Sequence, residues 1–187
     1  MKLLIQSILL TIVFTVITGI VYPLVITGIS QVAFKDKANG SLLERNGEVV
    51  GSELIAQQFT GDKYFWPRPS AGSYATVPSG ASNYGPTSQK LHDAVATNAA
   101  AFIAGNKLPA NTPVPADMVF TSASGLDPHI SPAAARLQIA RVAAARTADV
   151  AQVTGLVEKF VEAPQWGFLG ESRVNVLKLN LALDAMK

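Results

Sequence analysis

The chain has 187 residues, a net charge of +2 and no cysteine, and 49% of its residues are hydrophobic. The missing cysteines exclude disulfides and thiolate chemistry. The small net charge provides no basic field of the kind that nucleic-acid-binding proteins use. About 150 residues follow the apolar N-terminal segment, which is enough for one domain with its own core.

The first element is a run without charged residues or histidine, from Leu3 to Phe34. A helix needs about 20 predominantly apolar residues to cross a bilayer, and this run is longer. A cleaved signal peptide has an apolar core of only about 7 to 15 residues, so the length favours a retained helix. Its hydroxyl side chains can bond to backbone carbonyls one turn earlier, and Pro23 is expected to kink it. We therefore expect a transmembrane helix over residues 1–34 and a soluble domain over residues 35–187.

Charge alone does not give the orientation of this helix. Lys2 and the amino terminus precede it, and Lys35 and Lys37, offset by Asp36, follow it. The excess of positive charge that marks a cytoplasmic flank is therefore nearly balanced between the two ends. Both sides of the membrane remain possible for the soluble domain on the residues alone.

The first part of the soluble domain is predicted to be mostly irregular. Turn dipeptides on both sides of residues 41–45 predict a small hairpin that returns over 48–50. Ser52 is a suitable N-cap for a short helix through Phe59. Residues 61–87 are rich in proline, glycine and serine and also contain several aromatic residues, which indicates a long loop. This loop is either a solvated linker or a packed functional segment.

The second part of the domain is predicted to be mainly helical. Helices are predicted over residues 88–104, 131–146 and 148–161, the second from its alanine-rich composition and the other two from apolar residues at helical spacing. Ser131, followed by proline, is the expected N-cap of the second of these helices. Leucines at every second position over residues 177–184 predict a half-buried strand. The fold class is therefore α+β, with one N-terminal transmembrane helix and a helix-dominated domain that has a small β component.

The charged and polar residues form no recognisable catalytic pattern. Arg136, Arg141 and Arg146 are five residues apart, which spreads them around a helix instead of forming a stripe. The two histidines have neither a cysteine partner nor an HExxH motif, so a zinc site is not expected. The chain has no GxxxxGK phosphate loop and no GxSxG nucleophile motif. Asp117 and Asp127 could form a carboxylate pair, but a cap and a turn are the more common roles. We predict no catalytic residues and no metal ligands.

Ordered sequence blocks along nearly the whole chain resemble one protein family. The blocks are Thr18-Gly19 with Tyr22-Pro23, Asn39-Gly40-Ser41, Gly51-Ser52, Gln58-Phe59-Thr60-Gly61, Tyr64-Phe65, Arg68-Pro69-Ser70-Ala71, Ser79-Gly80-Ala81-Ser82-Asn83, Ser122-Ala123-Ser124-Gly125-Leu126-Asp127, Gln138-Ile139-Ala140-Arg141-Val142-Ala143, Val174-Asn175-Val176 and Leu179-Asn180-Leu181-Ala182-Leu183-Asp184. Together they resemble the C subunit of the Kdp-type potassium-transporting P-type ATPase, an inner-membrane complex of bacteria and archaea. Two departures lie in the long loop, where Ala81 replaces a common glycine and Trp66-Pro67 replaces a common His-Gly pair.

This resemblance implies an accessory subunit that has no phosphorylation site of its own. Its partners would be a channel-like potassium-binding subunit, an ATP-hydrolysing P-type subunit and the lipid bilayer. In this family the C subunit is described as a catalytic chaperone that raises the ATP affinity of the ATP-hydrolysing subunit. No intrinsic cofactor is implied, and ATP would be met through the complex. The family also implies an inner-membrane location with the soluble domain on the outer, periplasmic face.

Two alternatives to the chaperone role remain open. One is a lid or stabiliser on the outer face of the channel-like subunit, without nucleotide binding. The absence of a phosphate loop and of an acidic funnel for potassium agrees with this role. The other alternative, from a different class of protein, is a free-standing membrane-anchored hydrolase.

The resemblance also selects candidate site residues. In the membrane helix, small and hydroxyl-bearing residues allow close helix approach, so a contact with another subunit is expected at Thr18, Gly19, Tyr22 and Pro23. In the soluble domain, the residues expected to organise the structure or an interface are Arg68, Ser70, Ser82, Asn83, Asp127 and Asn175. For each of these six, holding a turn through side-chain-to-backbone bonds is an equally good role.

Overall fold

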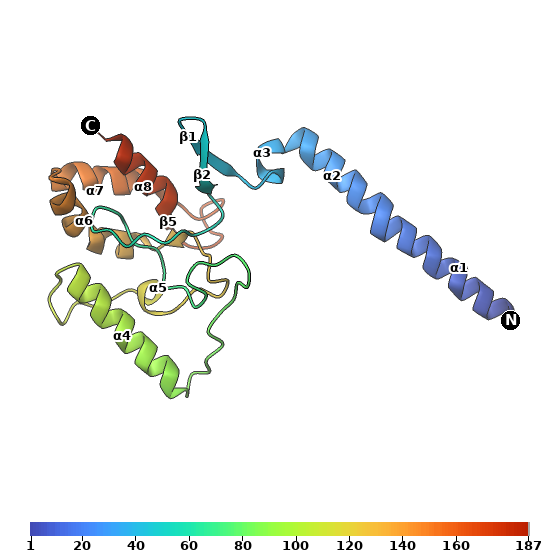
Figure 1. Ribbon diagram of the computed structural model, residues 1–187, viewed down its shortest axis with the longest axis horizontal. Coiled ribbons are helices and arrows are strands. Elements are labelled where there is room, and N and C mark those ends of the chain that lie inside the picture. Colours follow the sequence, from blue (N-terminus) through green and yellow to red (C-terminus); the bar gives the residue numbers. More distant parts are fainter. Residues whose placement is uncertain (187) are drawn as a thin grey trace. The chain divides into compact units, whose positions relative to one another are not determined.

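The computed structural model describes residues 1–186 and divides into two compact units, Met1–Val50 and Gly51–Lys187. Figure 1 gives the order of the helices and strands along the chain. One long apolar helix comes first, and a helix-rich domain with small sheets follows it. The predicted α+β class is therefore confirmed. The domain boundary after residue 34 stays a prediction.

The N-terminal unit begins with a single uninterrupted helix from Lys2 to Ala33. It consists of α1 (Lys2–Val16), a π-helical turn (Ile17–Val21) and α2 (Tyr22–Ala33), and none of its residues is buried. The hydroxyls of Ser7, Thr11 and Thr18 donate to carbonyls three or four residues earlier, at 2.7–3.0 Å. The helix is long and apolar enough to cross a membrane.

Pro23 disturbs this helix through its hydrogen-bond pattern. The π turn ends two residues before Pro23. Proline has no N–H and its ring clashes with the carbonyl four residues earlier, and a wider turn relieves both problems. The sequence therefore indicated the place of the irregularity, and the structure gives its form.

A short helix and a hairpin complete the N-terminal unit. After α3 (Lys35–Ala38), strands β1 (Leu42–Arg45) and β2 (Glu48–Ser52) form a two-stranded sheet. Asn46 and Gly47 join them with φ angles of 56° and 83°. Positive φ at both central residues is the geometry that Asn-Gly favours in a tight hairpin. The predicted hairpin is confirmed.

The short helix predicted over residues 52–59 is wrong. The Ser52 hydroxyl accepts a bond from the Leu54 N–H at 3.1 Å, as a capping side chain would. The Ala56 N–H, however, donates to the carbonyl of Leu126 at 2.9 Å instead of to the carbonyl four residues earlier. A bond to a distant segment has replaced the local bond that an α-helix requires. The chain then follows the predicted loop over residues 61–87, which contains neither helix nor strand.

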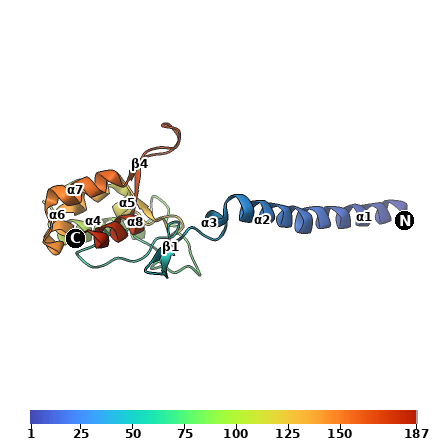
Figure 2. The same cartoon turned by 90° about the horizontal axis from the view of Figure 1, so that it is seen from above.

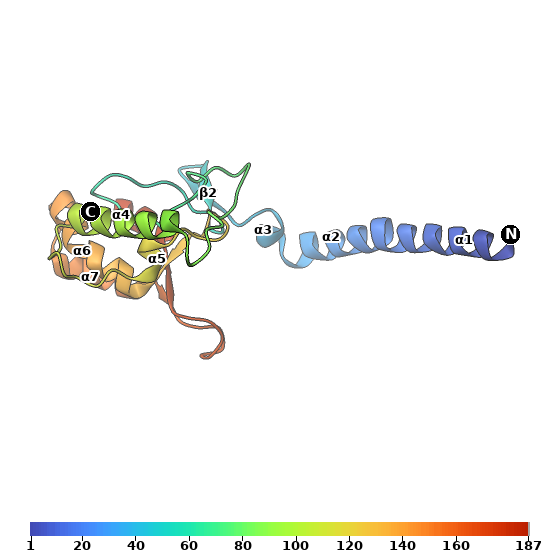
Figure 3. The ribbon, with the colours of Figure 1, turned by 90° about the horizontal axis from the view of Figure 1, so that it is seen from below.

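The three predicted helices of the second unit are present. They are α4 (Gln89–Gly105), α6 (Pro132–Arg146) and α7 (Val150–Lys159), and the short α5 (Ala116–Val119) lies beside α4. Figure 3 shows α4 along one side of this domain. Ser131 caps α6 as predicted, since its hydroxyl accepts from the Ala134 N–H at 3.1 Å. Asp149 caps α7 in the same manner.

The strand predicted over residues 177–184 is wrong, because this segment forms helix α8 (Val176–Ala185). Its buried residues include Val176, Leu179, Asn180 and Leu183, which repeat at helical spacing. The alternating leucines fitted a strand only if Asn180 faced solvent. Asn180 is 1% exposed, so the polar position that suggested a period of two belongs to the buried face.

A small sheet and three helices enclose the core of the second unit. Strands β3 (His129–Ile130), β5 (Arg173–Asn175) and β4 (Val161–Glu162) form an antiparallel sheet in the order β3-β5-β4. Helix α6 packs on α7 and α7 packs on α8, and Figure 2 shows these elements from above. His129 begins β3. The core includes fully buried residues from the loop, the helices and the sheet, among them Phe65, Val142, Val153, Val157, Val174 and Leu179.

Candidate functional site

The segment from Asp62 to Trp66, which we call the strap, is held along its backbone by two amide side chains. The Phe65 N–H donates to Asn180 Oδ1 at 2.8 Å, and Asn180 Nδ2 donates to the Phe65 carbonyl at 3.0 Å. Gln138 does the same for Trp66, with bonds of 2.7 and 3.2 Å. Both amides are buried, on α8 and α6 respectively. They supply the donors and acceptors that a neighbouring strand would otherwise provide.

Arg141 fixes the start of the strap from the middle of α6. Its Nη1 donates to the carbonyls of Asp62 and Tyr64, at 2.6 and 2.9 Å. Its Nε donates to Asn106 Oδ1 and its Nη2 to Gln138 Oε1, both at 2.8 Å. The residue is 5% exposed, and this burial lowers the pKa of the guanidinium to about 10, against the opposing effect of the Asp62 charge. A buried guanidinium can stay charged because several hydrogen bonds replace its contacts with water.

Arg146 holds the outer edge of the strap from the end of α6. Its Nε donates to the Lys63 carbonyl at 2.6 Å, and its Nη2 donates to Asp184 Oδ1 at 2.7 Å. The Tyr64 hydroxyl donates to the other oxygen of Asp184, at 3.1 Å. Arg136 lies on the exposed side of the same helix, where its side chain is 52% exposed. The arginines are spread around α6 as predicted, and two of them bind the strap.

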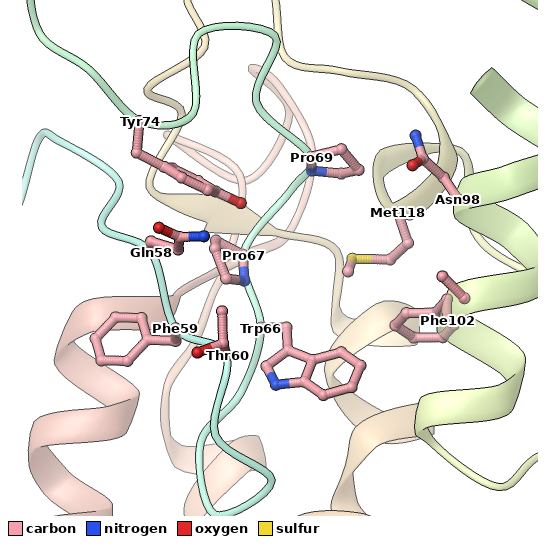
Figure 4. A pocket seen from close by; sticks show the side chains of 11 residues that line it. Gln58, Phe59, Thr60, Trp66, Pro67, Pro69, Tyr74, Asn98, Phe102 and Met118 are labelled. Atoms are coloured by element: carbon pink, nitrogen blue, oxygen red, sulfur yellow. The ribbon is translucent and has the colours of Figure 1, made fainter.

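Trp66, at the end of the strap, contributes to an open, mainly apolar groove of about 390 Å³. Figure 4 shows Phe59 and Trp66 entering it from the strap side and Phe102 and Met118 from the side of α4 and α5. The groove is lined by Gln58, Phe59, Thr60, Trp66, Pro67, Pro69, Tyr74, Asn98, Ala101, Phe102 and Met118. None of these residues carries a charge, so the groove suits an apolar or aromatic surface more than an ion.

The position of Trp66 in this groove is set from two sides. The Arg141 guanidinium lies 3.8 Å from the centre of its ring, and its Nε1 donates to the Gly61 carbonyl at 3.2 Å. On the other side, the ring packs so closely on α4 that a Cβ at Gly105 would come within 2.5 Å of it. A cation over an indole is attracted by the negative face of the ring.

The structure brings three of the predicted site residues together. Arg68 Nη1 pairs with Asp127 Oδ2 at 2.7 Å. Tyr74 connects this pair to Ser70, because its hydroxyl donates to the Arg68 carbonyl at 2.7 Å and its N–H donates to Ser70 Oγ at 3.0 Å. The Asp127 Oδ1 atom accepts the His129 N–H at 3.0 Å. Burial acts to raise the pKa of Asp127, but the hydrogen bonds from His129 and Arg68 outweigh it and lower the pKa to about 2.

The other predicted residues of the domain lie apart from this group. Asn175 is the N-cap of α8, where its Oδ1 accepts the Lys178 N–H at 3.1 Å and its Nδ2 donates to the Glu53 carbonyl at 2.8 Å. The Ser82 hydroxyl accepts a long contact of 3.5 Å from the Thr121 hydroxyl, and Asn83 occupies a positive-φ position at 55°. Side-chain-to-backbone bonds are the observed geometry at Asn175, and a role at an interface stays a prediction for all six residues.

The four candidate contact residues of the membrane helix lie at and beside the π turn. Thr18 and Gly19 belong to the turn itself, and Tyr22 and Pro23 open α2. The Thr18 hydroxyl is bonded within the helix, to the Phe14 carbonyl at 2.7 Å. Nothing lies within 4 Å of a Cβ built at Gly19, so that position is open to a close neighbour. The subunit contact at these residues stays a prediction.

Sequence reasoning did not select the buried residues that hold the strap, among them Gln138, Arg141 and Asn180. All three lay inside blocks that carried the family resemblance. A further signal was available, because each is a polar residue within a helix, and three of the four residues one turn away from it are apolar. A polar residue on such a buried face must have hydrogen-bond partners.

These features define a class of protein: a domain with a structural polar network and an apolar groove, preceded by one helix able to cross a membrane. Among residues 1–186, no group of three or more His, Cys, Asp or Glu side chains could hold a metal ion. The buried polar side chains that hold the strap bind its main-chain atoms and one another. This arrangement is typical of a domain that presents a fixed surface.

Comparison with known proteins gives the family. The family model described as KdpC, K⁺-transporting ATPase, c chain, matches residues 4–185. The chain is 54% identical over 185 residues to the potassium-transporting ATPase KdpC subunit of Mycobacterium tuberculosis (strain H37Rv), covering 98% of both chains. It is 57% identical over 173 residues to the protein of the same name from Rhodospirillum rubrum, covering 91% of this chain and 89% of the relative. It is 53% identical over 186 residues to the one from Koribacter versatilis, covering 98% of this chain and 94% of the relative. The chain therefore belongs to the KdpC family, which confirms the resemblance found in its sequence.

Proposed function

We propose that this chain is a single-pass accessory subunit of a potassium-transporting ATPase in the inner membrane, and that its domain lies on the outer face. The observation that carries this proposal is the helix Lys2–Ala33, which is apolar along its length and has no buried residue. A surface of that kind needs lipid or other membrane helices around it. The open position at Gly19 and the irregular turn around it suit close contact with a partner helix.

We propose further that the domain stabilises the complex by docking as a lid on the channel-like subunit. The strap supports this role because its main chain and the Trp66 ring are held in one arrangement by residues of the same domain. A preorganised surface loses less conformational entropy on association than a flexible one. The neutral, aromatic groove fits an apolar segment of a protein partner.

The catalytic-chaperone role is the second candidate, and the groove supports it less well. Nucleotide phosphates are bound by arginine, lysine, a metal ion or the N–H groups at a helix N-terminus. None of the residues lining the groove is lysine or arginine. We therefore propose that any effect on ATP affinity passes through the ATP-hydrolysing subunit, and we propose no cofactor for this chain alone.

Co-purification with a tagged channel-like subunit tests the proposed role. One variant lacks residues 3–34, and a matched variant replaces them with an unrelated apolar helix of equal length. The deletion should abolish assembly, and the replacement should restore membrane location but recover only part of the complex. Full assembly without any N-terminal helix would contradict the proposal. Protease accessibility of a tag after Lys187 in intact cells then tests the outer-face location.

Nucleotide titration of the full chain in lipid nanodiscs separates the two candidate roles. If the domain is a stabiliser, the chain alone should show no saturable ATP binding at physiological concentrations, whereas the assembled complex should bind ATP. Saturable binding to the chain alone would favour the chaperone role. Turnover of a hydrolysable substrate by the chain alone, lost on Ser70→Ala or Ser82→Ala, would instead support a hydrolase.

A further inference from the structure

The connection between β4 and β5 exposes large apolar side chains. Residues 163–170, which we call the aromatic tip, project away from the rest of the domain in both Figure 2 and Figure 3. Trp166 is 84% exposed, Phe168 is 74% exposed and Leu169 is 45% exposed. The eight residues of the tip include no charged residue. Exposed apolar groups gathered at one place mark a surface that contacts another apolar phase.

The backbone of the tip is ordered by its own hydrogen bonds. Gln165 and Leu169 exchange two N–H to carbonyl bonds, both at 2.9 Å. The Gly167 N–H donates to the Pro164 carbonyl at 3.0 Å, and the Phe168 N–H donates to the Gln165 carbonyl at 3.3 Å. Main-chain groups that are already paired can enter a region of low polarity without losing bonds to water.

The backbone at Trp166 has an unusual conformation, and its side chain is exposed. Its φ angle is 53°, in the left-handed region that bulky residues rarely adopt. Such a conformation persists only where the surrounding structure imposes it, and it recurs at binding surfaces. The indole is 84% exposed, so packing of this side chain inside the domain does not offset the energetic cost of the conformation.

The charges at the base of the tip are nearly balanced. Glu162 and Arg173 pair across the two strands at 3.0 Å, and Glu171 adds one further negative charge. A surface that recognises anionic lipid or nucleic acid presents several lysines or arginines, and the tip presents none. Its chemistry therefore matches a neutral apolar boundary, and the contact should be insensitive to salt.

We propose that the aromatic tip inserts Trp166, Phe168 and Leu169 into the headgroup–acyl boundary of the bilayer that holds the N-terminal helix. This proposal rests on the proposed function, because it requires the helix Lys2–Ala33 to span that bilayer. Indole rings favour the membrane–water interface, where one part of the ring is apolar and the N–H is wet. The helix tethers the domain to the lipid, so even a weak insertion is populated.

The shape of the tip favours lipid over a protein pocket as the occupant. Protein interfaces surround an apolar centre with a polar rim that forms hydrogen bonds. Here the apolar side chains stand at the end of a narrow two-stranded connection, and the nearest charged residues lie at its base. A narrow apolar element of this form can enter the headgroup–acyl boundary of a bilayer without the ring of hydrogen-bonding residues that a protein interface has. A second membrane contact would also limit the orientations that the domain can adopt.

Tryptophan fluorescence of the full chain in phosphatidylcholine nanodiscs tests the insertion. The signal of Trp166 is the difference between the parent chain and Trp166→Phe, because Trp66 is present in both. With acyl chains brominated near the headgroup, most of the Trp166 emission should be quenched, and with ordinary lipid it should be shifted to the blue. As a matched control, Val77→Trp in the Trp166→Phe background places an indole at another exposed site, and its emission should be unaffected.

The outcomes separate the two proposals. Failure of the chain to co-elute with nanodiscs would contradict the membrane-spanning helix and, with it, the tip insertion. Co-elution with unquenched Trp166 emission would overturn the insertion alone. If Trp166 is unquenched in the chain alone but becomes shielded when the other subunits are added, the tip is a protein-docking element and the lipid proposal is wrong. Phe168→Glu, which keeps the indole, should reduce the bromine quenching of Trp166 without changing the circular dichroism of the domain.

Discussion

The guanidinium of Arg141 lies 3.8 Å from the ring centre of Trp66, although the two residues are 75 positions apart in the sequence. The same guanidinium donates to two carbonyls of the strap and to two side-chain oxygens. One buried side chain of α6 therefore contacts both the main chain of the strap and the Trp66 ring that lines the groove. Four predictions follow the hydrogen bonds and close contacts around this connection and at Asp127.

Arg141→Lys should destabilise the domain strongly. A lysine ammonium has one nitrogen and cannot reach all four acceptors, and each buried acceptor left without a donor costs about 1–3 kcal/mol. We expect a loss of roughly 3 kcal/mol in the free energy of unfolding, with the emission of Trp66 shifted to the red. Thermal unfolding of the full chain in detergent, followed by circular dichroism, measures the loss. Arg136→Lys, on the exposed side of the same helix, should give no measurable change.

Alanine at two helical glycines should have effects of opposite sign. At Gly105 the new Cβ would lie 2.5 Å from the Trp66 ring, so Gly105→Ala should overpack the contact and cost about 1–3 kcal/mol. At Gly155, in α7, nothing lies within 4 Å of the new Cβ. There the higher helix propensity of alanine should stabilise the domain by up to about 1 kcal/mol. Equal effects at both positions in thermal unfolding would contradict the close packing of Trp66 on α4.

Asn180→Leu should loosen the strap. The change preserves approximate size but leaves the Phe65 N–H and carbonyl buried without partners, which costs about 1–3 kcal/mol for each group. Amide hydrogen exchange at Phe65 should accelerate more than exchange in α7. Gln152→Leu, at an exposed amide on α7, is the matched control and should leave exchange in the strap as it is. Unchanged protection at Phe65 in the Asn180 variant would show that the amide pairing does not hold the segment.

Asp127 should contribute a pH-dependent part of the stability. Its pKa is lowered to about 2 in the folded chain, whereas an unperturbed aspartate has a pKa of about 3.9. The contribution is therefore fully present above pH values near 4 and is lost as the pH falls toward 2. Asp127→Asn should lower the melting temperature at pH 7 and flatten its dependence on pH below 4. Asp93→Asn, at an exposed position, serves as the control for the loss of one carboxylate.

Local signals predicted those elements whose hydrogen bonds are local. The helices α4 and α7 have apolar residues at helical spacing, whereas α6 is rich in alanine and begins at the capping residue Ser131. The predicted helix over residues 52–59 failed because Ala56 bonds to Leu126, a residue 70 positions away. The sequence around residue 56 gives no signal that predicts this long-range bond.

The candidate site was predicted in part for a related reason. Arg68 and Asp127 were both selected, but their pairing across 59 positions is visible only in the folded chain. The predicted strand over residues 177–184 required Asn180 to face solvent. Asn180 is instead buried, and the segment forms α8. A buried amide and an exposed amide are identical in sequence, and only the partner distinguishes them.

The amides of Gln138 and Asn180 bind the main chain of the strap, and every amino acid except proline offers that main chain the same donor and acceptor. The path of the strap is therefore encoded in α6 and α8, while the side chain at position 66 can be exchanged. The main-chain bonds that fix the strap at residue 66 therefore do not require a particular side chain there. The shape and polarity of the groove can thus diverge between relatives while its location in the fold stays constant.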